Sequence, residues 1–408
     1  MGSMVFLSVG GLEIDWGKNR GFTDHSALYQ PSDLKEIPYY YVDLDTDEDI
    51  IEYKDGLSKP LNEVIDRIEL LGHTSEACKS EFHYLSRLND FNTELFSFEN
   101  LQKSISELDI KNISKRYDDE HDFGKFFRRE IFPKLNIEKH ANDPHHAQFN
   151  ACYAMENLSS YTILHLLRNN PIARTLTVDW GFADIEYGGW VTREEMICGP
   201  QANDKFLIIT EGSSDAKIIK HALHLLKPHL LDFFDFIDME EGYPFTGSGN
   251  LVKFIKGLTS FSVQNNIIVI FDNDAEGVYG YNSCKNLNSR DNISILKLPD
   301  LDEFNCFKTL GPSGEHFLDI NGLAVAIECF LDIEKDACIR WSEYKYSMDA
   351  YQGSLVSKDK YKLEFLRQKT IKENYDYKKI LLVIENIIHE CVKMKEREVL
   401  KSFESLPY

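Results

Sequence analysis

With 408 residues, of which 43% are hydrophobic and 27% charged, the chain is long enough for two or three domains with hydrophobic cores and is not disordered. Its 67 acidic and 45 basic residues give a formal charge of −22, which disfavours a protein that binds nucleic-acid backbone by general electrostatic attraction alone. It has no apolar run of the ~18 residues that a membrane span needs, and its eight cysteines form no C-x-x-C pair, so we expect a cytoplasmic protein with reduced thiols and no membrane contact.

Residues 1–200 are predicted to form an N-terminal α+β domain that is largely helical. Three short strands are indicated, at residues 5–9, 12–16 and 39–44. From 61 to 167, apolar residues recur at intervals of three and four, as they do in amphipathic helices, and the last of these helices is expected at about 147–167. The segment 176–197 is expected to be rich in strands, and Gly199-Pro200 marks the predicted domain boundary.

Residues 201–322 have the pattern of an α/β domain. Short apolar strands are predicted at 206–210, 233–237, 267–271 and 293–298. Amphipathic helices are predicted between them, at 214–226, 251–258 and 278–287. Such an alternation predicts a Rossmann-like parallel sheet that helices cover on both faces. Residues 323–408 are predicted to form a helical C-terminal extension.

Acidic residues follow two of the predicted strands directly. Glu211 comes after the first strand, and Asp272 and Asp274 come after the third. In an open parallel sheet, ligands bind outside the carboxyl ends of the strands, so these three side chains are expected to face one crevice. Their mutual repulsion would cost several kcal/mol without a counter-charge. Oxygen ligands without His or Cys favour Mg²⁺ or Mn²⁺, so we predict a divalent-cation site.

The same segments resemble the TOPRIM domain of topoisomerases, bacterial primases and several nuclease families. The resemblance rests on Glu211-Gly212 after the first strand, a glycine-rich segment at 247–249 after the second, and Asp272-Asn273-Asp274 after the third. The resemblance covers about 100 residues. It implies that Glu211, Asp272 and Asp274 are catalytic residues that hold Mg²⁺ and act with it on phosphodiesters. The first 200 residues and the stretch 340–365 resemble bacterial HEPN/TOPRIM-associated proteins, which are linked to phage defence.

The resemblance also implies further metal ligands. Asp215 matches an extra acid of the nuclease branch that helps to hold a second ion, although a first-turn acid stabilised by the helix dipole is an equal alternative. Asp319 and Glu328 lie in a downstream segment similar to one of nuclease-type members and are candidate ligands. Glu276, which follows the D-x-D motif, is included in the predicted metal set.

Missing motifs exclude several TOPRIM enzymes. The chain has no Cys/His cluster like that of primases, is too short for a type IA topoisomerase, and has no G-x-x-x-x-G-K-[ST] motif for an ATPase partner domain. A nuclease that acts alone or with a partner subunit remains. In such an enzyme Lys297 could neutralise transition-state charge, although an ordinary strand-end lysine is the simpler interpretation, and His316 is most simply a surface histidine.

The function predicted from the sequence is therefore a Mg²⁺-dependent nuclease acting on DNA or RNA, tRNA among them, as an antiphage or abortive-infection effector. Because of the negative charge, we expect it to act with a partner subunit or as a homo-oligomer. A catalytically silent TOPRIM module with a regulatory or scaffolding role is one alternative. Another is a metal-independent HEPN-type ribonuclease, since Arg116 and His121 resemble the R-x4-6-H signature of that class.

Overall fold

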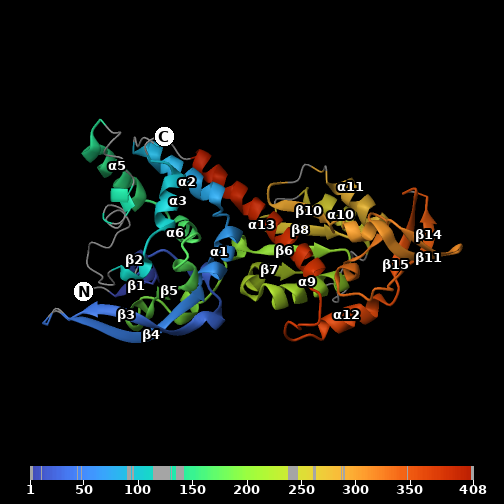
Figure 1. The fold of residues 1–408 in the computed structure, drawn as a ribbon, viewed down its shortest axis with the longest axis horizontal. Coiled ribbons are helices and arrows are strands. Elements are labelled where there is room, and N and C mark those ends of the chain that lie inside the picture. Colours follow the sequence, from blue (N-terminus) through green and yellow to red (C-terminus); the bar gives the residue numbers. More distant parts are fainter. Residues whose placement is uncertain are drawn as a thin grey trace. The chain divides into compact units, whose positions relative to one another are not determined.

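The computed structural model describes residues 3–405, apart from 11, 44, 47, 90–92, 94–95, 114–128, 130, 135–141, 238–246, 261–262, 286, 288–289 and 347. The chain divides into two compact units (Figure 1). The first unit comprises Met1–Gln201 and Lys395–Tyr408, and the second unit comprises Ala202–Met394.

The first unit contains an antiparallel sheet with strand order β2-β1-β5-β4-β3. Its strands are β1 (Met4–Val9), β2 (Leu12–Lys18), β3 (Leu34–Val42), β4 (Asp49–Pro60) and β5 (Thr177–Gly181). The sequence analysis did not predict β4, whose first residues are polar or exposed, with Ile51 53% exposed. Its first half pairs only with β3, which lies a few residues earlier in the chain, whereas its second half is buried and also pairs with β5.

Helices make up most of the rest of the first unit. Those described are α1 (Leu61–Leu70), α2 (Ser75–Leu88), α3 (Phe98–Ser106), α5 (Pro144–Glu156), α6 (Ser160–Leu167), α7 (Ala183–Tyr187) and α8 (Arg193–Met196). The single helix predicted at about 147–167 is two helices. The break occurs because Ser159 adopts an extended conformation and its side chain caps α6 by accepting from the backbone N–H of Thr162.

The second unit contains the predicted parallel sheet, with strand order β10-β8-β6-β7 (Figure 1). Its strands are β6 (Phe206–Thr210), β7 (Phe234–Phe236), β8 (Asn266–Phe271) and β10 (Ile293–Lys297). The connecting helices are α9 (Ser213–Leu226), α10 (Ser248–Leu258) and α11 (Ala275–Cys284). Every residue of β8 is buried, as a central strand covered on both faces requires, which confirms the α/β fold with a Rossmann-like parallel sheet.

The segment that follows the parallel sheet is not helical throughout, and this part of the prediction was wrong. A second four-stranded sheet has the order β12-β11-β14-β15, and a short ladder pairs β13 with β9. The strands of the sheet are β11 (Phe307–Gly311), β12 (Gly314–Leu318), β14 (Ile339–Lys345) and β15 (Ala350–Leu355), and those of the ladder are β9 (Asn273–Asp274) and β13 (Ala324–Val325). These strands were missed because they are short and half exposed, so they lack the continuous apolar run of a buried strand.

Two helices end the chain, α12 (Lys358–Leu366) and α13 (Lys378–Ser405). The helix α12 packs against α9 and against the buried 3₁₀ helix Ile327–Phe330. None of the helices in the described part of the chain is long and apolar enough to cross a membrane.

Candidate functional site

The carboxyl ends of β6 and β8 form the centre of the candidate site. These neighbouring strands flank the point where strand order reverses, because β7 follows β6 on one side and β10 follows β8 on the other. Ligands of open α/β sheets bind at such a switch point. Glu211 follows β6, Asp272 follows β8, and the backbone N–H of Asp272 donates to the Glu211 carboxylate at 3.1 Å. The structure therefore brings these two predicted site residues into contact.

The carboxylates at this edge repel one another. Burial, followed by the charge of Asp274, raises the pKa of Glu211 to about 8, against the stabilising hydrogen bond from the Asp272 N–H. Burial also raises the pKa of Asp272 well above its ordinary value, and the charges of Asp215, Glu211 and Asp274 add to the rise. Both groups hold a proton more tightly than ordinary carboxyl groups because burial and the neighbouring negative charges disfavour their ionised forms.

Asp215 and Glu328 belong to the same cluster. Asp215 lies in the first turn of α9, where it accepts from the Gly212 N–H at 3.0 Å. Burial, and next the charge of Glu328, raise its pKa to about 7. Glu328 is only 2% exposed and its charge also raises the pKa of Asp272. Asp215 is thus a first-turn acid of α9, as the helix-dipole interpretation predicted. It also lies among the other acids, as the interpretation as a metal ligand required.

Asp274 and Glu276 make contacts with the second sheet. Asp274 caps α11, with one carboxylate oxygen accepting from the Gly277 N–H at 2.7 Å and the other accepting from the side-chain amide of Gln352 on β15. Burial raises its pKa, while these two hydrogen bonds oppose the rise. Glu276 forms an ion pair with Lys345 at 3.0 Å. Both oxygens of Asp274 are thus engaged by protein donors.

The middle residue of the D-x-D motif holds the surrounding loops together. Asn273 is fully buried, and its side-chain oxygen accepts from Lys297 Nζ at 2.7 Å and from the Gly322 N–H at 2.9 Å. Lys297 also contacts Asp300 at 2.7 Å, and Asn273 donates to the same carboxylate at 2.8 Å. Lys297 therefore supports the loop that carries the acids.

Asp319 and His316 lie elsewhere in the second unit. Asp319 is exposed, and its carboxylate accepts from the backbone and side-chain nitrogens of Asn321 at 2.9 and 3.0 Å. His316 is exposed on β12 and contacts the Ser313 hydroxyl at 3.0 Å. Both line a pocket beside Trp341. Of the two downstream acids singled out in the sequence, the structure brings Glu328 to the cluster and places Asp319 on this pocket wall.

The chemistry of the donor set fits a hard divalent cation, but the side chains are not arranged around one. Six carboxylates gather at the sheet edge, and burial together with mutual repulsion raises the pKa of Glu211, Asp215 and Asp272. Nevertheless, in the described part of the chain no three His, Cys, Asp or Glu side chains are placed to hold a metal ion as they stand. Coordination would require side-chain rotation, above all at Asp274, where a bound ion would replace the Gln352 amide.

Comparison with known proteins identifies the family. The model of the HEPN/Toprim N-terminal domain 1 family matches residues 1–204, which are half of the chain. The chain belongs to this family. Neither a curated protein nor a solved structure matches it. The match covers the N-terminal domain of this HEPN/Toprim protein and ends where the parallel sheet begins.

The HEPN-type pair of the sequence analysis has no structural description. Arg116 and His121 lie outside the described residues. Membership of the HEPN/Toprim family is shown by the match to the whole N-terminal segment and does not depend on this pair.

Three further residues of the HEPN/Toprim chain lie beside the acids, although the sequence did not indicate them as site residues. Gln352 binds Asp274, and the positive charges of Lys358 and Lys362 on α12 interact with Asp215. They lie more than 70 residues beyond the D-x-D motif, in the stretch 340–365, whose resemblance to HEPN/TOPRIM-associated proteins implies no site residue. Strand β15 and helix α12 bring them to the cluster, so only the tertiary fold could identify them.

Proposed function

We propose that the acidic edge of the parallel sheet is a Mg²⁺- or Mn²⁺-dependent phosphodiesterase site and that the protein is a nuclease. The observation that carries the proposal is the grouping of Glu211, Asp272 and Asp215 at the switch point of the sheet, where burial and mutual repulsion raise the pKa of all three. Buried like charges destabilise a fold, so a site that gathers them is a functional candidate. The TOPRIM resemblance of the same residues supports this choice.

Each residue of the cluster has a distinct part in the proposed reaction. Glu211, Asp272 and Asp274 would hold one ion, and Asp215 with Glu328 would hold a second. Bound there, the cation would polarise the scissile phosphate and lower the pKa of an attacking water. With only one ion bound, Glu211 would instead act as the general base that accepts a proton from that water. Lys358, whose charge already acts on Asp215, would attract the phosphate backbone of the substrate.

The net charge of −22 bears on the partners of such an enzyme. A strongly negative protein repels nucleic acid at long range, so the proposed nuclease would depend on its cations and on a partner subunit or a second copy of the chain for substrate capture. We propose an antiphage or abortive-infection role on the resemblance to HEPN/TOPRIM-associated proteins. Loss of phage protection in cells that carry the Asp272→Asn variant would support it, and unchanged protection would exclude a role for this site.

The decisive experiment measures cleavage of labelled DNA and RNA by the pure protein in Mg²⁺, Mn²⁺ or EDTA. Glu211→Gln and Asp274→Asn should each lower the cleavage rate by ~10² or more, because the loss of one electrostatic stabiliser has an effect of this size. EDTA should abolish cleavage by the wild type. Glu315→Gln is the matched control, since this exposed acid on β12 pairs with Lys308 and lies outside the cluster.

Two other outcomes would replace the proposal. Cleavage that resists EDTA and disappears in His121→Ala would assign the activity to a HEPN-type ribonuclease. A complete lack of cleavage, with an intact thermal response to Mg²⁺, would indicate a silent module with a regulatory or scaffolding role. The engaged oxygens of Asp274 and the lack of a preformed three-ligand arrangement in the described residues are the observations that favour the silent module.

A further inference from the structure

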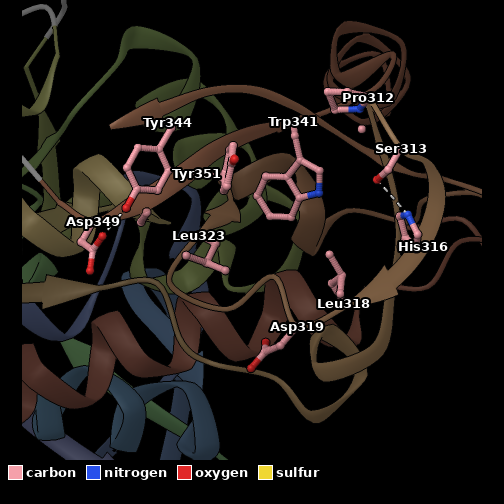
Figure 2. Close-up of a pocket in the computed structure, with 12 residues that line it drawn as sticks. Pro312, Ser313, His316, Leu318, Asp319, Leu323, Trp341, Tyr344, Asp349 and Tyr351 are labelled. Carbon is pink, nitrogen blue, oxygen red and sulfur yellow. Dashed lines mark hydrogen bonds between the residues drawn. The ribbon is translucent and has the colours of Figure 1, made fainter. Parts of the chain in front are cut away.

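A pocket of about 560 Å³ lies in the second unit between the turn of the β11–β12 hairpin and the strands β14 and β15 (Figure 2). Its volume is in the range of small-molecule sites. Three aromatic side chains form one wall, Trp341, Tyr344 and Tyr351, and the apolar side chain of Leu323 lies opposite them. The pocket is formed by the sheet that the sequence analysis did not predict, so none of the proposed catalytic residues accounts for it.

The aromatic side chains contact one another edge to face, with interplanar angles of 68° between Tyr344 and Tyr351 and 61° between Trp341 and Tyr351. The rings of Tyr344 and Tyr351 have centroids 5.0 Å apart, and those of Trp341 and Tyr351 are 6.5 Å apart. Tyr351 is 57% exposed, and the neighbouring Tyr346, which contacts Tyr344 with ring centroids 5.1 Å apart, is 90% exposed. Gathered aromatic side chains exposed to water mark a binding surface more often than an accidental one. Ring faces of this kind bind flat, neutral rings by stacking.

The polar groups of the pocket define the ligand further. Ser313 and His316 are hydrogen-bonded to each other at one end, and Asp349, which accepts from the Tyr344 hydroxyl, lies at the other end (Figure 2). The lining includes two carboxylates, Asp319 and Asp349, and, among the described residues, no lysine or arginine. A phosphate would therefore be repelled, whereas a neutral planar ring with hydrogen-bonding edges would be favoured. A nucleobase has this chemistry.

The pocket shares its structure with the acidic cluster. Leu323, on the pocket wall, forms a β-bridge with Asp274. Tyr351 immediately precedes Gln352, whose amide binds the Asp274 carboxylate. The β13–β9 ladder also pairs Ala324 with Asp274. A ring held between Leu323 and the aromatic wall would thus lie one strand away from a proposed metal ligand.

We propose that this pocket receives an unpaired nucleobase of the substrate, so that the enzyme acts on single-stranded nucleic acid or on an extruded nucleotide. The inference rests on the proposed nuclease function and names its substrate class. In a duplex the bases are stacked and paired, and their faces cannot reach the aromatic wall. Stacking on aromatic side chains tolerates any base, so the pocket selects strandedness and not sequence.

The test is a binding measurement that needs no turnover. Fluorescence anisotropy of labelled single-stranded and duplex oligonucleotides, DNA and RNA, is recorded in Mg²⁺ with the Asp272→Asn protein as the common background. We expect single strands to bind more tightly than duplexes. Tyr351→Leu and Trp341→Leu should each raise the Kd for single strands about tenfold or more, the effect of losing one base–aromatic stack. Trp341→Phe keeps an aromatic ring, so its Kd for single strands should stay close to that of the Asp272→Asn protein.

A matched control separates stacking from general surface changes. Tyr187→Leu removes an aromatic side chain of comparable exposure, 65% against 57% for Tyr351, from the first unit and should leave the Kd unchanged. Melting temperatures verify folding, and because Tyr351 is exposed, its variant remains informative if Trp341→Leu unfolds. Unchanged Kd values in folded pocket variants, equal binding of duplexes, or no binding of any oligonucleotide would overturn the inference.

The two proposals fail in different ways. Cleavage by the wild type combined with unaffected binding in the pocket variants would leave the nuclease in place and remove the base pocket. Binding that depends on Tyr351 and Trp341, without cleavage in any metal, would leave a single-strand-binding pocket and remove the nuclease.

Discussion

The buried and half-buried acids of the two units have opposite surroundings. In the first unit, Glu81 accepts from the Ser159 N–H at 2.7 Å, from the Ser159 hydroxyl at 2.9 Å and from the Thr162 hydroxyl. Asp184 is paired with Lys54 at 3.0 Å and accepts from Tyr41 at 2.9 Å. In the second unit, Glu211, Asp215 and Asp272 have other carboxylates as their main charged neighbours. The first arrangement stabilises a fold, whereas the second leaves charge available for a ligand.

The pKa directions express the same difference. Burial raises the pKa of both Asp15 and Glu69, but a hydrogen bond and charge from His25 lower that of Asp15, and the charges of Arg168 and His165 lower that of Glu69. In the second unit, burial and neighbouring acids act in the same direction and raise the pKa of Glu211 to about 8. Perturbation of a pKa by burial alone does not mark a site, because Glu81 is also raised by burial. The presence of like charges nearby is the distinguishing feature.

The largest difference is expected in metal-free stability, when one acid of the first unit and one acid of the cluster in the second unit are each replaced by an uncharged residue. Glu81→Ala should lower the free energy of unfolding by ~3 kcal/mol or more, because it leaves the Ser159 and Thr162 donors buried and unpaired. Asp272→Asn should leave the metal-free stability unchanged or raise it, because it removes repulsion. Urea denaturation with EDTA measures both. Equal losses in the two variants would mean that Asp272, like Glu81, is a structural acid.

The second prediction concerns Mg²⁺ and pH together. Between ~pH 4, where ordinary carboxyl groups titrate, and pH 8, the folded second unit holds protons that the unfolded chain has released, because the pKa values of Glu211 and Asp215 are raised to about 8 and about 7. Its metal-free stability therefore falls as the pH rises through this window. Mg²⁺ at a hundred times its Kd should raise the free energy of unfolding by ~2.7 kcal/mol. The ion should bind more tightly at pH 8 than at pH 6, because its carboxylate ligands must be deprotonated.

Thermal melts with and without Mg²⁺ at the two pH values measure this response. Asp272→Asn should reduce it, and Glu315→Gln should retain it in full. A response in Asp272→Asn as large as that of the wild type would remove Asp272 from the site. A wild type that melts at the same temperature with and without the ion at pH 8 would contradict metal binding by the acidic cluster.

A smaller effect is expected from adding a methyl group at the acidic edge. A Cβ at Gly277 would lie 2.2 Å from the Asp272 carbonyl oxygen and 2.9 Å from a Glu211 carboxylate oxygen. Gly277→Ala should therefore destabilise the second unit by ~1–3 kcal/mol, since the backbone must shift to make room. Gly257→Ala on α10, where a Cβ meets nothing within 4 Å, should instead stabilise by ~0.5–1 kcal/mol. Denaturation midpoints of the two variants compare them, and a tolerated Gly277→Ala would mean that the edge is not tightly packed.

Local patterns in the sequence were sufficient to predict the parallel sheet and the position of the acids that follow its strands. The two central strands are apolar runs, Glu211 and Asp272 follow them directly, and Asp274 comes two residues after Asp272. Parallel strands align their carboxyl ends, so the position of an acid after a strand already places it at the shared edge. The meeting of Glu211 with Asp272 was therefore predictable from the chain order of the elements.

The tertiary structure alone decided which distant residues join that edge and which do not. Gln352 reaches Asp274 because β15 lies in a half-exposed sheet whose strands lack a continuous apolar run. Glu328 joins the acids while Asp319, nine residues earlier, faces the aromatic pocket, since an intervening turn and the short strand β13 separate them. Such placements depend on packing between elements far apart in the chain. Sequence periodicity reports only which face of an element is buried, and not which partner it is buried against.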